Sequence, residues 1–441
     1  MVSACQRMLA DSAEASSSIL QYGPNEGYQD LRARLAHWLS RHYSFGLAMD
    51  PLRICITGGA SQGLACILQS FTDPAYTRAV WMIAPTYFMA AGIFADSGLG
   101  DKLRAVPEDE EGVDLGVLEA RISELERHEG TVAEGSASQQ FENDSALNGR
   151  TRFKDPGPYR KLYRHVIYTV PSCANPSGKV MSLSRREGLV SLARRHDALV
   201  VCDDVYDFLQ WPLEGPATAR DELETMMRLP RLCDIDRLAS VDDPRGFGHA
   251  VSNGSFSKLV GPGVRTGWVE GSHAFTLGLS KTGSTMSGGA PSQFCAGLMA
   301  ELLLTGELQN WVEATVRPAL RRRHGLMMRA VREHLMPLGV TAMESSIPGC
   351  DIYGGYFIWL TLGGRGLSAR VLSDAALREE NLVIGQGDDF AVPGDEEGPS
   401  FERNVRLSFS WESEENIVEG VRKLGELIRR VRDNPAQYRN L

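Results

Sequence analysis

The chain alternates between short apolar runs and segments in which apolar residues recur every three or four positions. The apolar runs have the length and composition of strands that are buried on both faces. They lie at residues 54–56, 80–83, 166–170 and 198–202. Helical spacing is found at residues 31–39, 64–71, 108–129 and 183–195. Strands that alternate with helices in this way predict an α/β fold with a mostly parallel central sheet.

The final third of the chain predicts a smaller α+β unit. Strands are predicted at residues 356–360 and 404–409, and helices at residues 369–378 and 415–432. Two further helices are predicted ahead of this unit, the second of them long. They lie at residues 291–304 and 311–338.

The predicted elements divide the chain into two domains. We expect a large domain at residues 45–310 and a small domain composed of residues 1–44 and 311–441. Polar, irregular stretches near residues 130–158 and 212–250 interrupt the large domain. We expect both stretches to be surface insertions.

One segment combines a lysine, small hydroxyl residues and a turn. Lys258 follows Ser255 and Ser257, and a turn rich in glycine and proline separates it from Arg265. A lysine that is partly desolvated and near another cation loses its proton more easily, so it can attack an aldehyde and form a Schiff base. The planar donors of Arg265 and the hydroxyl of Ser255 suit an anion such as a phosphate. An exposed loop with solvated side chains is the alternative for this segment by itself.

A second candidate anion site follows the predicted strand at residues 54–56. Gly59, Ala60 and Ser61 precede a predicted helix, and the free N–H groups and positive dipole end of a helix N-terminus attract anions. The turn lacks both the Gly-Lys-Ser/Thr of a Walker loop and the dinucleotide fingerprint. A plain connection between strand and helix is also compatible with these glycines.

Polar side chains follow two other predicted strands. Tyr87 comes just after residues 80–83, and Asp203 and Asp204 directly follow residues 198–202. Open parallel sheets bind ligands beyond the carboxyl ends of their strands, so Tyr87 and Asp203 are candidate ligand contacts. Two adjacent acids could also bind a metal, but neither a histidine nor a third acid follows at a useful spacing. We therefore expect a cationic partner, with Asp204 in a structural role.

Composition narrows the possible functions. The chain has 441 residues and a formal net charge of -10, which disfavours a nucleic-acid or anionic-membrane surface. Its eight cysteines are scattered without a CxxC pair, so the sequence predicts neither a zinc site nor a disulfide framework. We see no apolar run long enough to span a bilayer and no secretory core at the N-terminus. We expect a reduced, cytoplasmic protein.

Seven short motifs, in order along the chain, resemble those of the class I/II aminotransferases. These are pyridoxal 5′-phosphate (PLP) enzymes of fold type I. The motifs are Tyr22-Gly-Pro, Thr57-Gly-Gly-Ala-Ser-Gln, Pro85-Thr-Tyr, Asn175-Pro-Ser-Gly, Asp203-Asp-Val-Tyr, Ser255-Phe-Ser-Lys with Arg265, and Asn404-Val-Arg-Leu-Ser-Phe. They cover nearly the whole chain from Tyr22 onward, and they are most similar to the 2-aminoadipate, kynurenine and aromatic aminotransferase branch.

The resemblance implies roles for the residues around the cofactor ring. Lys258 would bind PLP covalently and, once released, move the proton of the substrate Cα. Asp203 would pair with the pyridinium nitrogen, which keeps the ring an electron acceptor. Asn175 and Tyr206 would bind the phenolic oxygen of the ring, and Tyr87 would stack on its face. Lys258, Asp203 and Tyr206 are the implied catalytic residues.

The resemblance also implies contacts for the phosphate, the substrate and a second subunit. The phosphate ligands would be Gly59, Ala60, Ser61, Ser255 and Arg265, with Ser257 left as a turn residue. Arg406, together with Asn175, would bind the α-carboxylate of the substrate. Tyr22 would reach the phosphate of the neighbouring subunit, which implies a homodimer with shared active sites.

The implied reaction is transamination of an L-α-amino acid with a 2-oxo acid. The same catalytic residues serve PLP-dependent β-elimination with C–S cleavage and cyclopropane-carboxylate synthesis, which stay open as alternatives. A PLP-sensing transcription regulator is disfavoured, because the residues before Tyr22 contain no helix-turn-helix module or basic patch. Only 21 residues precede Tyr22, fewer than in the family's N-terminal arm, so the arm is missing or the site closes differently.

Overall fold

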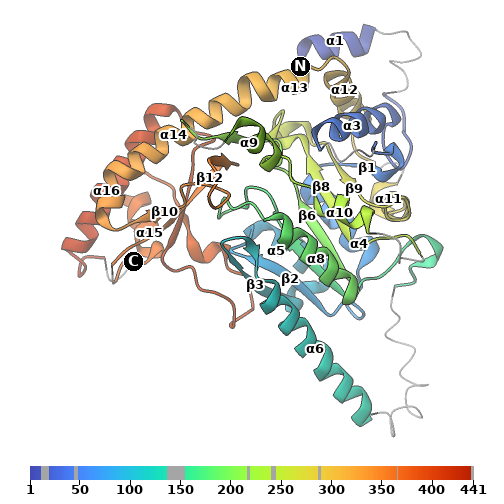
Figure 1. Ribbon diagram of the computed structural model, residues 1–441, viewed down its shortest axis with the longest axis horizontal. Helices are drawn as coiled ribbons and strands as arrows, with labels where there is room; N and C mark the ends of the chain where they lie inside the picture. The colour runs from blue at the N-terminus through green and yellow to red at the C-terminus, as the bar shows by residue number, and fades with distance from the viewer. Residues whose placement is uncertain are drawn as a thin grey trace.

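An eight-stranded sheet forms the centre of the computed structural model (Figure 1). The structure describes residues 1–10, 19–43, 48–136, 154–215, 219–239, 245–286, 290–364 and 366–438. The strands of the central sheet are, in spatial order, β1 (Ile54–Thr57), β9 (Gly267–Glu270), β8 (Ala250–Ser255), β6 (Ala198–Asp203), β5 (His165–Thr169), β2 (Ala79–Ala84), β3 (Leu103–Asp109) and β4 (Gly112–Val113). All neighbours from β8 to β3 pair in parallel, whereas β9 is antiparallel to β1 and β8. The prediction of a mostly parallel central sheet is confirmed.

Alternate residues of the central strands face two separate cores, which explains the continuous apolar runs. In β2, Val80 and Met82 pack in one core, and Trp81 and Ile83 pack in the other. The first core also contains side chains of α4 (Ala60–Phe71), α5 (Phe88–Phe94) and α11 (His273–Ser280). The second contains side chains of α6 (Leu115–Ser136), α8 (Leu183–Arg195) and α10 (Leu232–Leu238). Helices therefore cover both faces of the sheet, as the α/β pattern predicts.

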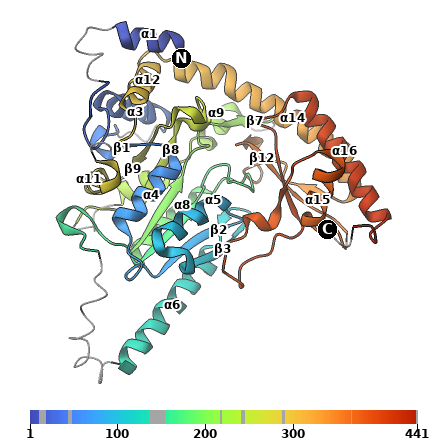
Figure 2. The ribbon, with the colours of Figure 1, turned by 180° about the vertical axis from the view of Figure 1, so that it is seen from behind.

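The C-terminal third forms a second, antiparallel sheet with its own helices (Figure 2). Its strands are, in spatial order, β10 (Thr341–Ala342), β12 (Phe357–Thr361), β14 (Asn404–Ser408) and β13 (Gly385–Gln386). Ile358 and Leu360 of β12 point into the core, so Phe357 and Trp359 lie on the opposite face of this sheet. The helices of this part are α14 (Arg317–His334), α15 (Ala369–Glu380) and α16 (Glu414–Asp433). The smaller α+β unit is confirmed.

A short ribbon joins the two sheets. β7 (Gln210–Pro212), which follows β6, pairs antiparallel with β11 (Ile352–Gly354), which precedes β12. Trp211 opposite Tyr353 fixes the register of the ribbon, and both side chains are buried in one core. The start of β12 is therefore held close to the segment that follows β6.

The N-terminal helices pack on α12 (Gln293–Leu304). Arg7 of α1 (Val2–Ala10) forms an ion pair of 2.7 Å with Glu301, and Arg34 of α3 (Gln29–His42) donates to the carbonyl of Ala300 at 3.0 Å. These contacts connect residues 1–44 with a helix that we placed in the large domain. The division of the chain into domains stays a prediction.

Two predicted regions differ in detail from the structure. The helix predicted at residues 108–129 begins only at Leu115, because residues 103–113 form β3 and its return strand β4. The region near residues 212–250 contains α9 (Arg220–Met226) and α10, and α10 packs on the central sheet. Of the region near residues 130–158, residues 137–153 lie outside the described residues. Within the described residues, we find no helix with the length and apolar character needed to cross a membrane.

Candidate active site

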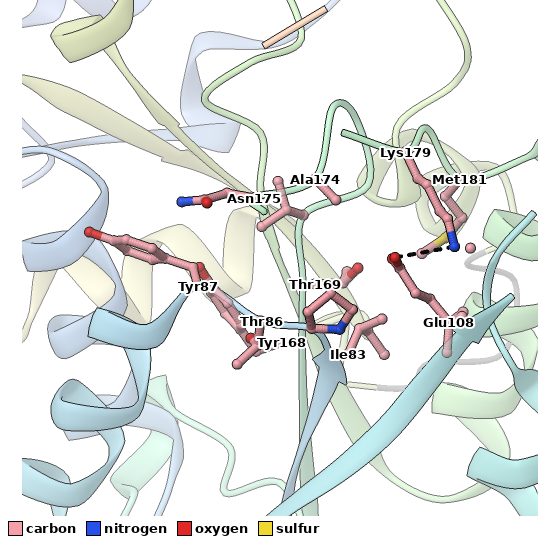
Figure 3. A pocket seen from close by; sticks show the side chains of 14 residues that line it. Ile83, Thr86, Tyr87, Glu108, Tyr168, Thr169, Ala174, Asn175, Lys179 and Met181 are labelled. Atoms are coloured by element: carbon pink, nitrogen blue, oxygen red, sulfur yellow. Dashed lines mark ion pairs between the residues drawn. The ribbon is translucent and has the colours of Figure 1, made fainter. Parts of the chain in front are cut away.

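The carboxyl ends of neighbouring strands bring the predicted site residues to one edge of the central sheet. Asp203 ends β6. β5 is parallel to β6, and β2 is parallel to β5, so the segments with Asn175 and Tyr87 leave the sheet at the same edge. Tyr87 and Asn175 line one cavity of about 20 Å³, large enough for a water molecule (Figure 3). Both point away from the ion pair of Glu108 and Lys179 at the other end of this cavity (Figure 3). β8 leads from this edge into the lysine segment.

Lys258 ends a short 3-10 helix that begins after β8. The side chain of Ser255 caps this helix, because its Oγ accepts a hydrogen bond from the backbone N–H of Ser257 at 3.1 Å. The amine of Lys258 lies 5.9 Å from the ring centre of Tyr206 and 5.2 Å from that of Tyr356. The amine of Lys258 therefore lies beside two aromatic rings that pack on each other.

The electrostatic environment favours a reactive amine at Lys258. Burial lowers the pKa of Lys258, because the charged ammonium loses solvation. The negative charge of Asp203 opposes this shift, and the positive charge of Arg406 adds to it. A lysine with a lowered pKa is a better nucleophile toward an aldehyde. The sequence predicts Arg265 as the cation near Lys258, whereas in the structure Arg406 has this effect on the Lys258 pKa.

Asp203 has one oxygen that is ready for a cationic donor. The hydroxyl of Tyr168 donates to its Oδ2 at 2.8 Å, whereas its buried Oδ1 has no hydrogen-bond partner among the described residues. Burial raises the pKa of Asp203 to about 6, against the effects of the Tyr168 hydrogen bond and the charge of Lys258. An unpaired carboxylate oxygen in this position is costly unless a donor arrives, and the N–H of a pyridinium ring fits this requirement.

Donors for an anion gather at the start of α4. Arg265 donates from Nη1 to Ser257 Oγ at 3.2 Å and from Nη2 to the carbonyl of Gly58 at 2.8 Å. Gly59 has a φ of 106°, and a β-carbon there would lie 2.6 Å from Arg265 Nη2. Only glycine therefore allows the backbone this close to the guanidinium. The N–H groups at the start of α4, the guanidinium and the serine hydroxyls form a cradle that suits a phosphate.

The other predicted phosphate ligands lie around this cradle. Ser255 donates to Ser257 Oγ at 2.9 Å, so its hydroxyl joins the same hydrogen-bond chain. Ala60 and Ser61 are the first two residues of α4, and the Ser61 side chain is exposed. Asn253 donates to the carbonyl of Ala60 at 2.9 Å, which ties the first turn of α4 to β8.

Arg406 and Asn175 meet across the cleft between the two sheets. Arg406 belongs to β14 and donates from Nη1 to Asn175 Oδ1 at 2.9 Å. Its guanidinium lies 4.1 Å from the ring centre of Phe357 and 4.7 Å from that of Phe390. Burial lowers the pKa of Arg406, with Tyr206 and Tyr87 acting in the opposite direction. A half-buried guanidinium that packs on two aromatic rings suits a carboxylate ligand.

The two other tyrosines predicted for the site, Tyr206 and Tyr87, also lie near Asp203. Tyr206 is buried and packs edge to face on Tyr356, with 5.5 Å between the ring centres. Burial raises the pKa of Tyr206 and of Tyr87, and the charge of Asp203 raises both further. Both phenols therefore stay protonated and can donate hydrogen bonds.

Tyr22 is the one predicted site residue that the fold does not bring to this cleft through a described contact. Its side chain is 79% exposed. The sequence prediction places Tyr22 at the active site of a second subunit, which a single chain does not test.

Three residues of the site were not predicted from the sequence. The sequence predicts only a turn role for Ser257, yet its Oγ accepts a hydrogen bond from Arg265. Tyr168 and Tyr356 were read only as strand residues, although they contact Asp203 and Lys258. A serine one residue before the lysine was a usable signal for Ser257. Neither tyrosine has a local signal, because their contacts depend on strand pairing.

A lysine after β8, an aspartate with an unpaired oxygen at the end of β6 and a group of anion donors at α4 fit what a PLP-dependent enzyme of fold type I requires. Within this class, the pattern of the family "Aminotransferase class I and II" matches residues 2–424, and the chain belongs to that family. It is a PLP-dependent aminotransferase, whose substrates are an amino acid and a 2-oxo acid.

Individual relatives agree with this family. The uncharacterized protein YER152C of Saccharomyces cerevisiae is 34% identical over 93% of this chain and 87% of its own length. The 2-aminoadipate transaminase of Thermus thermophilus is 29% identical over 97% of this chain and 85% of its own length. The structure of Pyrococcus horikoshii kynurenine aminotransferase, which contains pyridoxamine 5′-phosphate (PMP), has a TM-score of 0.72 and 25% identity over 97% of this chain and 87% of that one. The resemblance to the 2-aminoadipate and kynurenine aminotransferase branch is confirmed.

Proposed function

We propose that this aminotransferase acts on L-α-amino acids with long or aromatic side chains. The observation that carries the proposal is the aromatic wall around Arg406, whose guanidinium packs on the rings of Phe357 and Phe390. A substrate held by its carboxylate at Arg406 would place its side chain near these rings, where apolar contacts favour an extended or aromatic group. The activities named for the Thermus and Pyrococcus relatives support this substrate class.

Lys258 and Asp203 carry the proposed chemistry. Bound PLP supplies an electron-accepting ring next to the substrate Cα. Lys258, with its pKa lowered by burial, takes the proton from Cα and returns it at the cofactor carbon. Asp203 holds a proton on the ring nitrogen through its otherwise unpaired Oδ1. Tyr206 and Asn175 would bind the ring hydroxyl.

The remaining contacts orient the cofactor and the substrate. The proposed phosphate ligands are Gly59, Ala60, Ser61, Ser255 and Arg265, joined by Ser257. Arg406 binds the α-carboxylate through two parallel N–H donors, a geometry that lysine cannot provide. Tyr87 packs on the face of the ring, which excludes water from that side.

The proposed working unit is a homodimer in the cytoplasm. An exposed tyrosine such as Tyr22 fits a role at the phosphate of a second subunit, as the resemblance implies. A dimer of this kind has a two-fold axis, so each subunit would give Tyr22 to its partner and receive one in return.

Product analysis with a panel of donors tests the proposed function. L-2-aminoadipate, L-kynurenine, L-phenylalanine and L-alanine are each supplied with 2-oxoglutarate, and glutamate and the donor-derived keto acid are measured. We expect equal amounts of both products and a higher kcat/KM for the three larger donors than for L-alanine. A preference for L-alanine would overturn the substrate class. Failure to form glutamate and a keto acid from any of the donors would overturn transamination.

A further inference from the structure

Two glycines set the position of a tyrosine beside Lys258. A β-carbon on Gly354 would lie 2.4 Å from Cys173 Sγ, and one on Gly355 would lie 3.0 Å from Cys173 Cβ. Gly355 also has a φ of 74°, which favours glycine. The turn between β11 and β12 therefore presses against the loop that leads to Asn175. The next residue, Tyr356, is directed toward the lysine segment.

Tyr356 lies against both the backbone and the side-chain amine of Lys258. Its hydroxyl donates a hydrogen bond of 3.1 Å to the backbone carbonyl of Lys258. The centre of its ring lies 5.2 Å from the amine of the same lysine. A ring face within about 6 Å attracts an ammonium group through the quadrupole of the aromatic system, and burial strengthens this attraction. One side chain thus contacts both the backbone and the reactive atom of Lys258.

The other groups that face the amine come from two segments, the end of β6 with the residues that follow it and β14. Asp203 at the end of β6 attracts the ammonium, and Arg406 of β14 repels it. Tyr206 presents a second ring at 5.9 Å, and it packs edge to face on Tyr356. Of these contacts, the ring of Tyr356 is the nearer of the two aromatic faces.

We propose that Tyr356 is a positioning residue for Lys258, with its hydroxyl fixing the lysine backbone and its ring holding the protonated amine. The inference rests on the proposed role of Lys258 as the covalent PLP site. In each turnover the amine leaves and regains its covalent bond, and the Tyr356 ring gives it a defined place in the cleft between these events. Tyr356 acts through Lys258 and needs no contact with the substrate.

The pH dependence of PLP capture tests this proposal separately from turnover. The full-length wild-type protein and its variants are freed of PLP, mixed with fresh PLP at a series of pH values and treated with borohydride. The lysine amine condenses with the aldehyde with loss of one water, and hydride from borohydride then reduces the C=N bond. Peptide mass spectrometry measures the modification of Lys258. Because only the neutral amine attacks, the midpoint of the rate against pH reports the proton affinity of Lys258.

Two variants distinguish the contribution of the Tyr356 ring from that of its hydroxyl. Tyr356→Phe keeps the ring, so we expect an unchanged midpoint but capture about fivefold slower through loss of one hydrogen bond. Tyr356→Leu removes the ring as well, so the ammonium loses a stabilising contact and the midpoint moves down by roughly 0.5–1 pH unit. Tyr163→Phe is the matched control, because Tyr163 also donates to a backbone carbonyl, that of Gly248, at 2.6 Å. It should behave as the wild type.

A failure of the proposed role of Tyr356 and a failure of the proposed PLP-binding role of Lys258 would give different results. A Tyr356→Leu midpoint equal to that of the wild type, with unchanged capture by both Tyr356 variants, would overturn the positioning role. Wild-type protein that captures no PLP at Lys258 would instead overturn the proposed function. Because Tyr356→Phe keeps the shape of the side chain, it provides a folded variant even where Tyr356→Leu does not.

Discussion

Asp203 is buried and has an unpaired oxygen, so its ionisation should lower the free energy of unfolding of the protein without cofactor. The folded-state pKa of about 6 lies above the value of 3.8 for an exposed aspartate. As pH rises from about 4 to about 6, the unfolded chain releases this proton before the folded chain does. The free energy of unfolding therefore falls across that window, by about 3 kcal/mol for a shift of this size.

Asp203→Asn should remove this pH dependence. Without PLP, we expect the variant to gain stability over the wild type as pH rises from 4 to 6, with a constant difference above pH 6, because asparagine carries no buried charge. Urea unfolding at a series of pH values measures the difference. Asp96→Asn, at an exposed aspartate, is the control. If the difference in unfolding free energy between Asp203→Asn and the wild type did not change with pH, this would contradict the raised pKa of Asp203.

Replacing Arg406 should weaken substrate binding more than PLP binding. Arg406→Ala removes the proposed carboxylate contact, which corresponds to a loss of about 2–5 kcal/mol in substrate binding. We expect a large increase in the KM for amino acids with little change in PLP affinity. Arg406→Lys should recover only part of the loss, because lysine lacks the planar pair of donors. Arg422→Ala, in α16, serves as a control. Equal losses of PLP and substrate affinity in Arg406→Ala would contradict the assignment.

Residues with a local motif could be predicted from the sequence, and residues defined by packing could not. Lys258 and Arg265 belong to one contiguous segment with a local motif, so both could be named as site residues from the sequence, although the cation that acts on Lys258 is Arg406. Tyr168 reaches Asp203 only because β5 and β6 are neighbours in the sheet. Tyr356 reaches Lys258 only because β11 pairs with β7. No spacing along the chain encodes these two contacts.

Among the elements, the start of α4 should be sensitive to a single added carbon. Gly59→Ala places a β-carbon 2.6 Å from Arg265 Nη2 and forces alanine to a φ of 106°. We expect a loss of about 1–3 kcal/mol in unfolding free energy and weaker PLP binding, because Arg265 must move. Titration with PLP, followed by its visible absorption, measures the affinity. Gly92→Ala in α5, where a β-carbon meets no atom within 4 Å, should bind PLP as the wild type does. Equal PLP affinity in the two variants would argue against a phosphate at this helix end.

Elements with one clear periodicity of apolar residues were predicted more accurately than strands near the edge of the central sheet. The helix predicted at residues 183–195 has the bounds of α8, and the strand predicted at residues 198–202 lies within β6. β3 was missed because it pairs with the two-residue strand β4 and contains a proline and several charged residues. Its pattern resembles the start of an acidic helix. Only the pairing with β2 makes it a strand.

For the whole molecule, the shared-site homodimer predicts complementation between two defective variants. Lys258→Ala lacks the reactive amine, and Tyr22→Ala lacks the proposed contact with the partner's phosphate. If each site combines Lys258 of one subunit with Tyr22 of the other, a mixed dimer contains one intact site. After random exchange of equal amounts, about a quarter of the wild-type activity should appear. Sedimentation confirms the dimer, and activity no higher than the sum of the two variants would rule out shared sites.

For the molecule as a whole, the order of the motifs along the sequence was enough to predict the family and the α/β fold. The position of the small sheet over the edge of the large one could not be derived from the sequence. It depends on the pairing of β7 with β11 and on the contact of Arg406 with Asn175, residues that lie far apart along the chain.

Transamination at Lys258 is tested most directly by a single half-reaction. The purified protein is loaded with PLP and mixed with an L-amino acid in the absence of any keto acid, while absorption spectra and products are recorded. We expect the visible band of the lysine-bound cofactor to disappear as PMP and one equivalent of keto acid form, and Lys258→Ala to show neither change. Lys281→Ala, which removes another lysine amine that lies over an aromatic ring, should react as the wild type does. Release of ammonia without PMP, or full activity in Lys258→Ala, would contradict the assignment of this chain's chemistry to transamination at Lys258.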